Sequence, residues 1–404
     1  MAVAPAGTEH LQQPARLVGL DFLRGLVLTI VLVDHIDDLL VNQEFFTRWT
    51  LKGLGFSDAA EAFVFLAGFT FGWVFSPRLD RDGFWTCQRR VLLRSVQIYA
   101  AMMATTLIVT ALAWSVSRTS LAFHLPLTVT TSTMFLDEVR GTATLRNPVW
   151  GISILVVYVC VLPFLPAILV LAKRSLPAAL ALALSVYAAT QLSPALDFGD
   201  AGFNPLAWQV LAVIGLAAGH LAATRCPKTS KKQKPGFLDS KVDDQSEGPA
   251  CKGGKKPGFL AACFVLSLGA FMMLARAAAP EAPYVDWVNR HLIGSPAFSK
   301  TNLGIVRVLH FAAVAIVVAA ILRRWQDLPE ATWARPFVWS GRHSLPLFCL
   351  GVILAYLAAI ASAFLPEHLL SLLFLAADAV AVQFLAARLL ESRRLWRHAD
   401  RRDR

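Results

Sequence analysis

The sequence predicts an all-α integral membrane protein, a polytopic bundle of about ten transmembrane helices. Of its 404 residues, 56% are hydrophobic and only 16% are charged. The apolar residues form runs close to the ~20 residues that a helix needs to cross a bilayer. The Lys and Arg residues fall in short clusters between these runs, so the net charge of +11 indicates membrane topology. We therefore expect the lipid bilayer as a partner, and no nucleic acid.

Each apolar run is expected to be a helix, because an open strand edge cannot satisfy its backbone groups in lipid. The first run is too long and too polar for a signal peptide and should stay in the membrane. The expected helices cover residues 20–41, 58–76, 92–114, 148–171, 176–192, 204–223, 257–277, 302–323, 337–361 and 364–391.

The basic connections between these runs alternate with connections that are poor in Lys and Arg, so the positive-inside rule predicts that both termini are cytoplasmic. Residues 226–256 are rich in Lys, Gly, Pro and Ser and lack periodicity, which predicts a cytoplasmic linker. The linker would join a first membrane half of about six helices (20–225) to a second of about four (257–391). Residues 1–19 and 392–404 would form cytoplasmic tails. The six cysteines show no metal-ligand spacing, so we expect no metal site.

The most informative residues are polar ones inside apolar helices. The first helix carries Arg24, Asp34 and His35. An Arg or Asp at a helix centre costs roughly 2.5–3.5 kcal/mol on insertion scales, so these side chains are expected to face the protein interior or an aqueous cavity. Arg24 and His35 are eleven residues apart, which places them on nearly one face and about 16 Å apart along the axis.

Several further segments accompany this Arg and His pair. They are GFSDAAEAFVFLAGFTFG (55–72), FNPLAWQ (203–209), KTNLGIVRVLH (300–310) and SGRHSLPLFCLG (340–351). With them, the sequence resembles the membrane acyltransferase-3 superfamily, and within it the OpgC group, the succinyltransferases of osmoregulated periplasmic glucans. The resemblance implies an enzyme of the bacterial inner membrane that transfers an acyl group, with succinyl as the first expectation, from cytoplasmic acyl-CoA to hydroxyls of a periplasmic glucan. Succinyl-CoA or acetyl-CoA would be a co-substrate, with no bound cofactor.

The resemblance and the chemistry of O-acyl transfer together suggest roles for the first helix. His35 is expected to act as a general base toward a sugar hydroxyl, or as a transient acyl carrier, although an interfacial packing role is the alternative. Arg24 would bind the phosphates or carboxylate of acyl-CoA, unless it only snorkels to the inner interface.

Charged residues at other helix starts extend the candidate site. Asp58 and Glu61 would orient or charge-stabilise His35, or simply cap their own helix. Lys300, Arg307 and His310 would form a cationic pocket for a succinyl carboxylate, or Arg307 would pair with an acidic residue. Arg342 lies in the segment expected to open the ninth helix. It would bind a CoA phosphate, or it would be explained by helix capping and the positive-inside rule alone.

Residues at the outer helix starts are candidates for binding the acceptor, here a periplasmic glucan or another envelope glycan. Asn204, Trp208 and Gln209, with Trp150, would stack on the sugar and hydrogen-bond to it, or would anchor the interface. Residues 115–147 are read as a long outer loop, and Gly68 and Gly72 as a site of close helix approach.

Two other functions remain open at this stage. One is an O-acetyltransferase of another envelope polysaccharide. The other is a glycan or lipid-carrier transporter without covalent chemistry, for which broken midplane helices would be expected. The sequence leaves the oligomeric state open.

Overall fold

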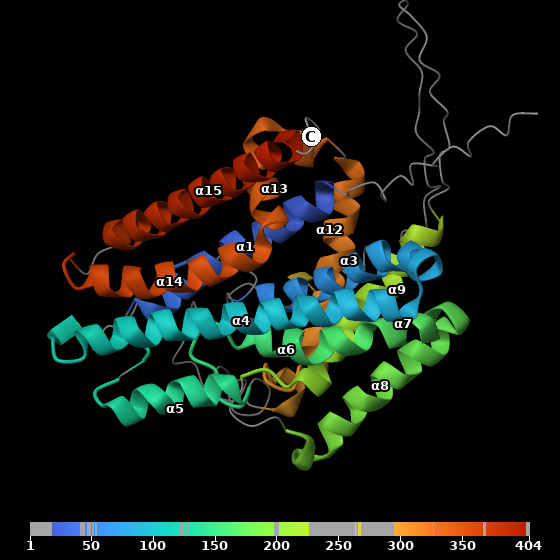
Figure 1. Ribbon diagram of the computed structural model, residues 1–404, viewed down its shortest axis with the longest axis horizontal. Coiled ribbons are helices and arrows are strands. Elements are labelled where there is room, and N and C mark those ends of the chain that lie inside the picture. Colours follow the sequence, from blue (N-terminus) through green and yellow to red (C-terminus); the bar gives the residue numbers. More distant parts are fainter. Residues whose placement is uncertain are drawn as a thin grey trace, which may run out of the picture. The chain divides into compact units, whose positions relative to one another are not determined.

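The computed structural model describes residues 18–40, 45–46, 50, 52, 55–121, 125–127, 129–197, 202–225, 263, 266–267, 295–325, 327–366 and 369–400. Every regular element within these ranges is a helix (Figure 1), which confirms the predicted all-α class. The predicted linker 226–256 and nearly all of the predicted span 257–277 lie outside the described residues.

The longer helices follow the apolar runs of the sequence. They are α1 (Val18–Leu39), α3 (Ala59–Asp82), α4 (Phe84–Val116), α8 (Leu176–Leu192), α9 (Pro205–Arg225), α12 (Ile305–Arg324), α14 (Ser344–Ser362) and α15 (Leu369–Asp400). The shorter helices are α5 (Ser132–Ala143), α6 (Ile154–Val161), α7 (Leu165–Arg174) and α13 (Arg335–Arg342). The 3-10 turns are η2 (Leu162–Phe164), η3 (Pro194–Leu196), η6 (Pro296–Phe298), η7 (Leu328–Glu330) and η8 (Thr332–Ala334).

Within the described residues, seven helices are long and apolar enough to cross a membrane: α3, α4, the run Ile154–Arg174, α9, α12, α14 and α15. They correspond to seven of the ten predicted spans. The other three predictions fall on α1, on α8 and on the span outside the described ranges. α1 carries five charged residues in 22, and α8 has only 17 residues. The chain is thus a polytopic membrane protein, while a total of ten spans is not confirmed.

Two elements differ from the sequence-based expectation. The predicted outer loop 115–147 contains α5, a 12-residue helix whose N-cap Thr131 accepts a hydrogen bond from the backbone N–H of Met134. The predicted single helix 337–361 is in fact α13 and α14, which are separated at His343 (φ −116°, ψ 37°). The break falls in the polar stretch 340–344, which the sequence analysis took as the start of one helix.

Contacts divide the chain into two compact units. Unit 1 combines Met1–Phe46, Val74–Pro166 and Trp325–Arg404, and its core is built where α1 packs against α13, α14 and α15. Part of this core is formed by Leu32 and Ile36 of α1 and by Leu40, which follows α1, together with leucines and alanines of α14 and α15. α1 and α13 also approach closely, because a side chain at Gly25 or Gly341 would overlap the other helix's backbone.

Unit 2 combines Thr47–Trp73 and Ala167–Arg324. Here α3 and α9 meet through two glycine pairs. A Cβ at Gly68 or Gly72 would overlap backbone carbonyls of α9, and a Cβ at Gly215 or Gly219 would overlap backbone carbonyls of α3. The predicted role of Gly68 and Gly72 in close helix approach is therefore confirmed, and it is reciprocal.

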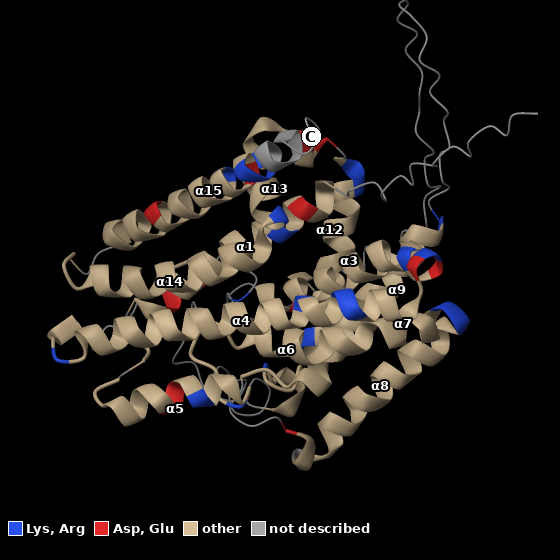
Figure 2. Cartoon of the chain, viewed as in Figure 1, with Lys and Arg blue, Asp and Glu red and all other residues tan. Residues whose placement is uncertain are grey.

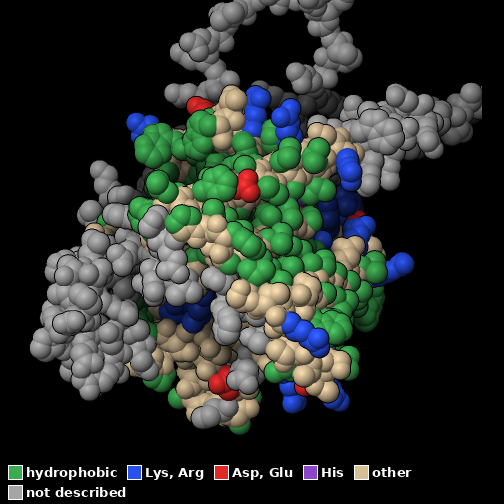
Figure 3. Space-filling model, turned by 90° about the vertical axis from the view of Figure 1, so that its left-hand side faces the viewer, with side chains coloured by type: hydrophobic (Ala, Val, Ile, Leu, Met, Phe, Trp, Pro, Cys, Tyr) green, Lys and Arg blue, Asp and Glu red, His purple; other side chains and the backbone are tan. Residues whose placement is uncertain are grey.

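The exterior fits a lipid environment. Lys, Arg, Asp and Glu lie mostly near helix ends and in connections (Figure 2), while hydrophobic side chains cover much of the face in Figure 3. Large apolar side chains stand fully outward on α15, where Leu370 is 77% and Phe374 is 63% exposed. Apolar groups exposed in this way match the apolar interior of a bilayer.

Candidate acyl-transfer site

The first group of candidate residues lies on α1, in unit 1. The guanidinium of Arg24 interacts electrostatically with Tyr158 of α6. The imidazole of His35 lies against Trp150, just before the same helix, with ring centroids 4.8 Å apart and planes inclined by 53°. Both side chains therefore turn toward residues 150–158, which supports the prediction that they share one face of α1.

His35 is half-buried in a pocket of backbone and aromatic groups. Gly151 has φ +91°, and a Cβ added there would lie 3.8 Å from Cε1 of His35 and 3.2 Å from Val352. Trp150 in turn packs against Tyr356 of α14, with ring centroids 6.2 Å apart. The imidazole is thus packed against the protein and keeps part of its surface open.

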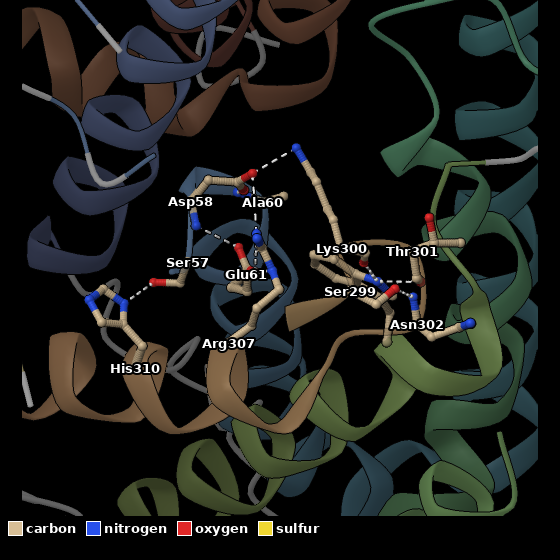
Figure 4. Close-up of polar contacts among 11 residues, drawn as sticks. Ser57, Asp58, Ala60, Glu61, Ser299, Lys300, Thr301, Asn302, Arg307 and His310 are labelled. Atoms are coloured by element: carbon tan, nitrogen blue, oxygen red, sulfur yellow. Dashed lines mark hydrogen bonds and ion pairs between the residues drawn. The ribbon is translucent and has the colours of Figure 1, made fainter. Parts of the chain in front are cut away.

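A second group of candidates forms a charged cluster in unit 2, defined as Asp58, Glu61, Lys300 and Arg307 (Figure 4). Nη2 of Arg307 lies 2.6 Å from Oε1 of Glu61 and 3.4 Å from Oδ2 of Asp58. Nε of Arg307 donates a hydrogen bond to Oε1 of Glu61, at 2.7 Å. Nζ of Lys300 lies 2.7 Å from Oδ2 of Asp58.

The same two acids also cap α3. The backbone N–H of Asp58 donates to Oε2 of Glu61 at 2.9 Å, and the N–H of Ala60 donates to Oδ1 of Asp58 at 2.7 Å. This reciprocal arrangement satisfies donors that the first turn of a helix leaves without partners. The capping alternative predicted for this pair is therefore present, together with the ion pairs.

The alternative predicted for Arg307, pairing with acidic residues, is present in the charged cluster, while a cationic pocket for a succinyl carboxylate stays a prediction. Burial opposes ionisation of Asp58, but the charges of Lys300 and Arg307 outweigh it and hold the pKa of Asp58 well below its ordinary value. Burial lowers the pKa of Lys300, but the Asp58 carboxylate prevails and the net pKa is raised. Both groups are therefore charged at neutral pH.

Lys300 is the accessible member of the cluster. Its side chain is 47% exposed, against 13% for Arg307, and its ammonium lies 5.4 Å from the ring centroid of Phe203. Any ligand that reaches this cluster would meet the Lys300 and Asp58 pair before the buried Arg307 and Glu61 pair.

His310 lies one turn beyond Arg307 on α12, but it is not part of an anion site. Its Nδ1 lies 2.7 Å from the hydroxyl of Ser57, and its side chain is buried. A Cβ at Gly55 would overlap the imidazole ring, so this position needs glycine. Ser57 and Gly55 were missed by sequence reasoning, although both belong to the segment 55–72 that contains Asp58.

The predicted acceptor-binding residues mainly build unit 2. Asn204 and Trp208 are fully buried. The amide of Asn204 donates to Asn302, and the indole N–H of Trp208 donates to the carbonyl oxygen of Lys300. The amide of Gln209 donates to the carbonyl oxygen of Ala183, on α8. This geometry favours a structural role, because these polar groups are already bonded within the protein.

Arg342 is held by carboxylates and does not open a helix. It is the last residue of α13, and its guanidinium lies 2.7 Å from Glu391 and 3.4 Å from Asp21. His343 contacts the second carboxylate oxygen of Glu391, at 3.0 Å. The helix expected to open at this segment, α14, begins only at Ser344, two residues after Arg342, and the binding of a CoA phosphate by Arg342 stays a prediction. Glu391 was missed, although an acid at the end of an apolar run was visible in the sequence.

The described residues contain no group of three or more His, Cys, Asp or Glu side chains that could hold a metal ion. The chemistry available in them is that of imidazole, guanidinium, ammonium and carboxylate groups.

The fold and these residues define a polytopic helical membrane protein with a packed histidine and an arginine on one side of α1. Comparison with known families then gives its membership. The model of the OpgC protein family matches residues 16–235 and 248–395. The chain therefore belongs to the OpgC family, and this membership indicates an acyltransferase that acts on a glucan. The searches of curated proteins and of solved structures returned no match.

Proposed function

We propose that this protein is an O-acyltransferase of the bacterial inner membrane, with both termini in the cytoplasm. It transfers a succinyl group from succinyl-CoA on the cytoplasmic side to hydroxyls of a periplasmic glucan. The observation that carries the proposal is the placement of Arg24 and His35 on one side of α1, in a chain that belongs to the OpgC family.

The proposed reaction assigns one task to each end of α1. Arg24 binds the phosphates or the carboxylate of the acyl-CoA, because a guanidinium forms paired hydrogen bonds to such anions. His35 takes the proton of the sugar hydroxyl while that oxygen attacks the thioester carbonyl carbon. The new ester C–O bond forms, the C–S bond breaks, and the proton is passed to the leaving thiolate.

The charged cluster stabilises the unit in which it lies, unit 2. Asp58 and Glu61 fix the start of α3 through ion pairs to Lys300 and Arg307. A direct action of either carboxylate on His35 is not required by the mechanism.

The test replaces His35 with Asn in the native host, followed by mass spectrometry of the isolated periplasmic glucans. We expect succinyl substituents to disappear while the protein level in the membrane is normal. Asp38→Asn is a matched control, because Asp38 is exposed and lies three residues further along α1. Normal succinyl content in the His35→Asn strain would exclude His35 as the base.

One observation favours a second candidate, the transfer of acetyl to an envelope polysaccharide. In the charged cluster, Lys300 and Arg307 already contact the carboxyl groups of Asp58 and Glu61, so neither cation is left for a succinyl carboxylate alone. An acetyl group carries no carboxylate, so its transfer needs no cation to bind one. Mass spectrometry of envelope glycans from strains with and without the gene separates the candidates, because only one of the two ester types would be lost.

A further inference from the structure

The aromatic ring beside His35 has a role that neither the family nor the proposed reaction assigns. The centroids of the Trp150 and His35 rings are 4.8 Å apart. A cation within about 6 Å of an indole ring centroid is attracted by the negative charge of the ring face. Trp150 therefore lies at the distance at which it can stabilise His35 in its protonated form.

Trp150 is held in this position by its own neighbours. The hydroxyl of Tyr356 is directed at the carbonyl oxygen of Trp150 at 3.5 Å, and Tyr356 is fully buried. The next residue, Gly151, adopts φ +91°, which L side chains rarely adopt. The left-handed turn and the buried tyrosine together fix the indole against the imidazole.

Apolar groups around His35 increase the effect of a contact that stabilises its protonated form. Trp150 packs on the core cluster that includes Leu32 and Ile36 of α1. A charged imidazolium among apolar groups loses solvation, and a π face replaces part of that loss. General-base catalysis produces this imidazolium whenever His35 accepts the proton of the attacking hydroxyl.

We propose that Trp150 is a positioning residue for acyl transfer, which orients the His35 ring and stabilises the imidazolium that forms during the reaction. This inference rests on the proposed function in its link to acyl transfer, although the contact itself does not. In this proposal Trp150 contacts the transiently protonated His35 ring, and not the sugar.

A substitution at Trp150 leaves the other ionisable side chains around His35 in place. On α1 they are Asp34, Asp37 and Asp38. From α14 Tyr356 faces Trp150, and Glu138 of α5 acts electrostatically on Tyr356. On α15, Asp378 is exposed and points away from the core. A change seen on substitution of Trp150 alone is thus due to the indole.

The experiment uses the full-length protein in detergent or vesicles with the variants Trp150→Leu and Trp150→Phe. Because His35 must be neutral to act as a base, loss of the indole should move the acid limb of the kcat profile to lower pH. We expect a shift of about 0.4–1.5 pH units for Trp150→Leu and a smaller one for Trp150→Phe. Trp85→Leu is the control, because Trp85 is 78% exposed on α4.

A second readout does not depend on activity. Nitrogen-15 NMR of labelled histidine follows the protonation of His35 directly, assigned by comparison with His35→Asn. A displacement of this titration to lower pH in Trp150→Leu supports the inference, whether or not the wild type transfers an acyl group. A wild type that transfers no acyl group would remove the proposed function instead. If Trp150→Leu does not fold, the smaller shift expected for Trp150→Phe tests the inference.

An unchanged pH profile and an unchanged NMR titration would overturn the inference. An increase in KM for the acceptor with both titrations unchanged would assign Trp150 to sugar stacking instead.

Discussion

The interaction of Glu61 with Arg307 is the most deeply buried ion pair of the charged cluster, since the Glu61 side chain is 0% and the Arg307 side chain 13% exposed. Removal of one partner from a buried pair leaves an uncompensated charge, which costs about 3–5 kcal/mol. We therefore expect Arg307→Met to lower the free energy of unfolding by roughly this amount. Thermal unfolding in detergent measures the loss.

The control for this prediction is the double variant Arg307→Met with Glu61→Gln. Neutralising both partners removes the buried charge, so part of the stability should return. If the double variant is as unstable as the sum of the two single variants, the pair is not coupled and the explanation is wrong.

The pair of Asp58 and Lys300 predicts how stability responds to pH. The depressed pKa of Asp58 gives stability that is present above its unfolded pKa of about 3.9 and is lost as pH falls through the folded value. The raised pKa of Lys300 gives stability that is present below about 10.4 and is lost as pH rises through the folded value.

The contribution of this pair should thus be constant from about pH 5 to pH 9. The measurement compares melting temperatures of the wild type and of Asp58→Asn with Lys300→Met across that range. A difference that changes near neutral pH would show that another group, and not this pair, governs the response.

At the scale of single residues, the sequence indicated the candidate residues better than it indicated which residues they contact. Arg24, His35, Asp58 and Arg307 stood out because charges in apolar runs are costly. The pairing of Glu61 with Arg307 joins residues 246 positions apart, and that of Arg342 with Glu391 joins residues 49 apart. Such partners are set by tertiary packing, which one sequence does not reveal.

At the scale of helices, the contact between α3 and α9 depends on the absence of side chains. A Cβ at Gly68 would overlap the backbone of Ala212, which cannot rotate away. We expect Gly68→Ala to cost about 1–3 kcal/mol, and Gly68→Leu to abolish folding. The yield of monodisperse protein in detergent and its melting temperature test this.

Gly351→Ala is the matched control on another helix. A Cβ there would lie 3.8 Å from Leu32 and 3.9 Å from Gln383, which is ordinary contact. Because alanine has a higher helix propensity than glycine, Gly351→Ala should be neutral or slightly stabilising. An equal loss of stability for Gly68→Ala and Gly351→Ala would show that close approach to α9 does not explain the effect.

The helices themselves followed from hydropathy, and their interruptions did not. Seven apolar runs became helices of spanning length because backbone groups in lipid must bond internally. The break at His343 was missed because the polar residues 340–344 were taken as the start of one helix, whereas they separate α13 from α14. α5 was missed because its 12 residues are too few and too polar to register as a span.

At the scale of the whole molecule, the distribution of basic residues predicts orientation. Arg323 and Arg324 end α12, and Lys173 and Arg174 end α7. By the positive-inside rule these ends are cytoplasmic, which is consistent with both termini on that side. A fluorescent protein fused to the C-terminus should fluoresce, and a phosphatase that needs the periplasm should be inactive there. An active phosphatase fusion would invert the topology and place His35 on the wrong side for a periplasmic acceptor.

The most direct test of acyl transfer through His35 is the rate at which purified protein in vesicles transfers a labelled succinyl group from succinyl-CoA to glucan. Loss of a general base typically costs about 10²–10⁴-fold in rate. We predict a loss in that range for His35→Asn relative to the wild type, with folding and the rate of Asp38→Asn unchanged. A rate for His35→Asn close to that of the wild type would contradict the assignment of His35 as the base.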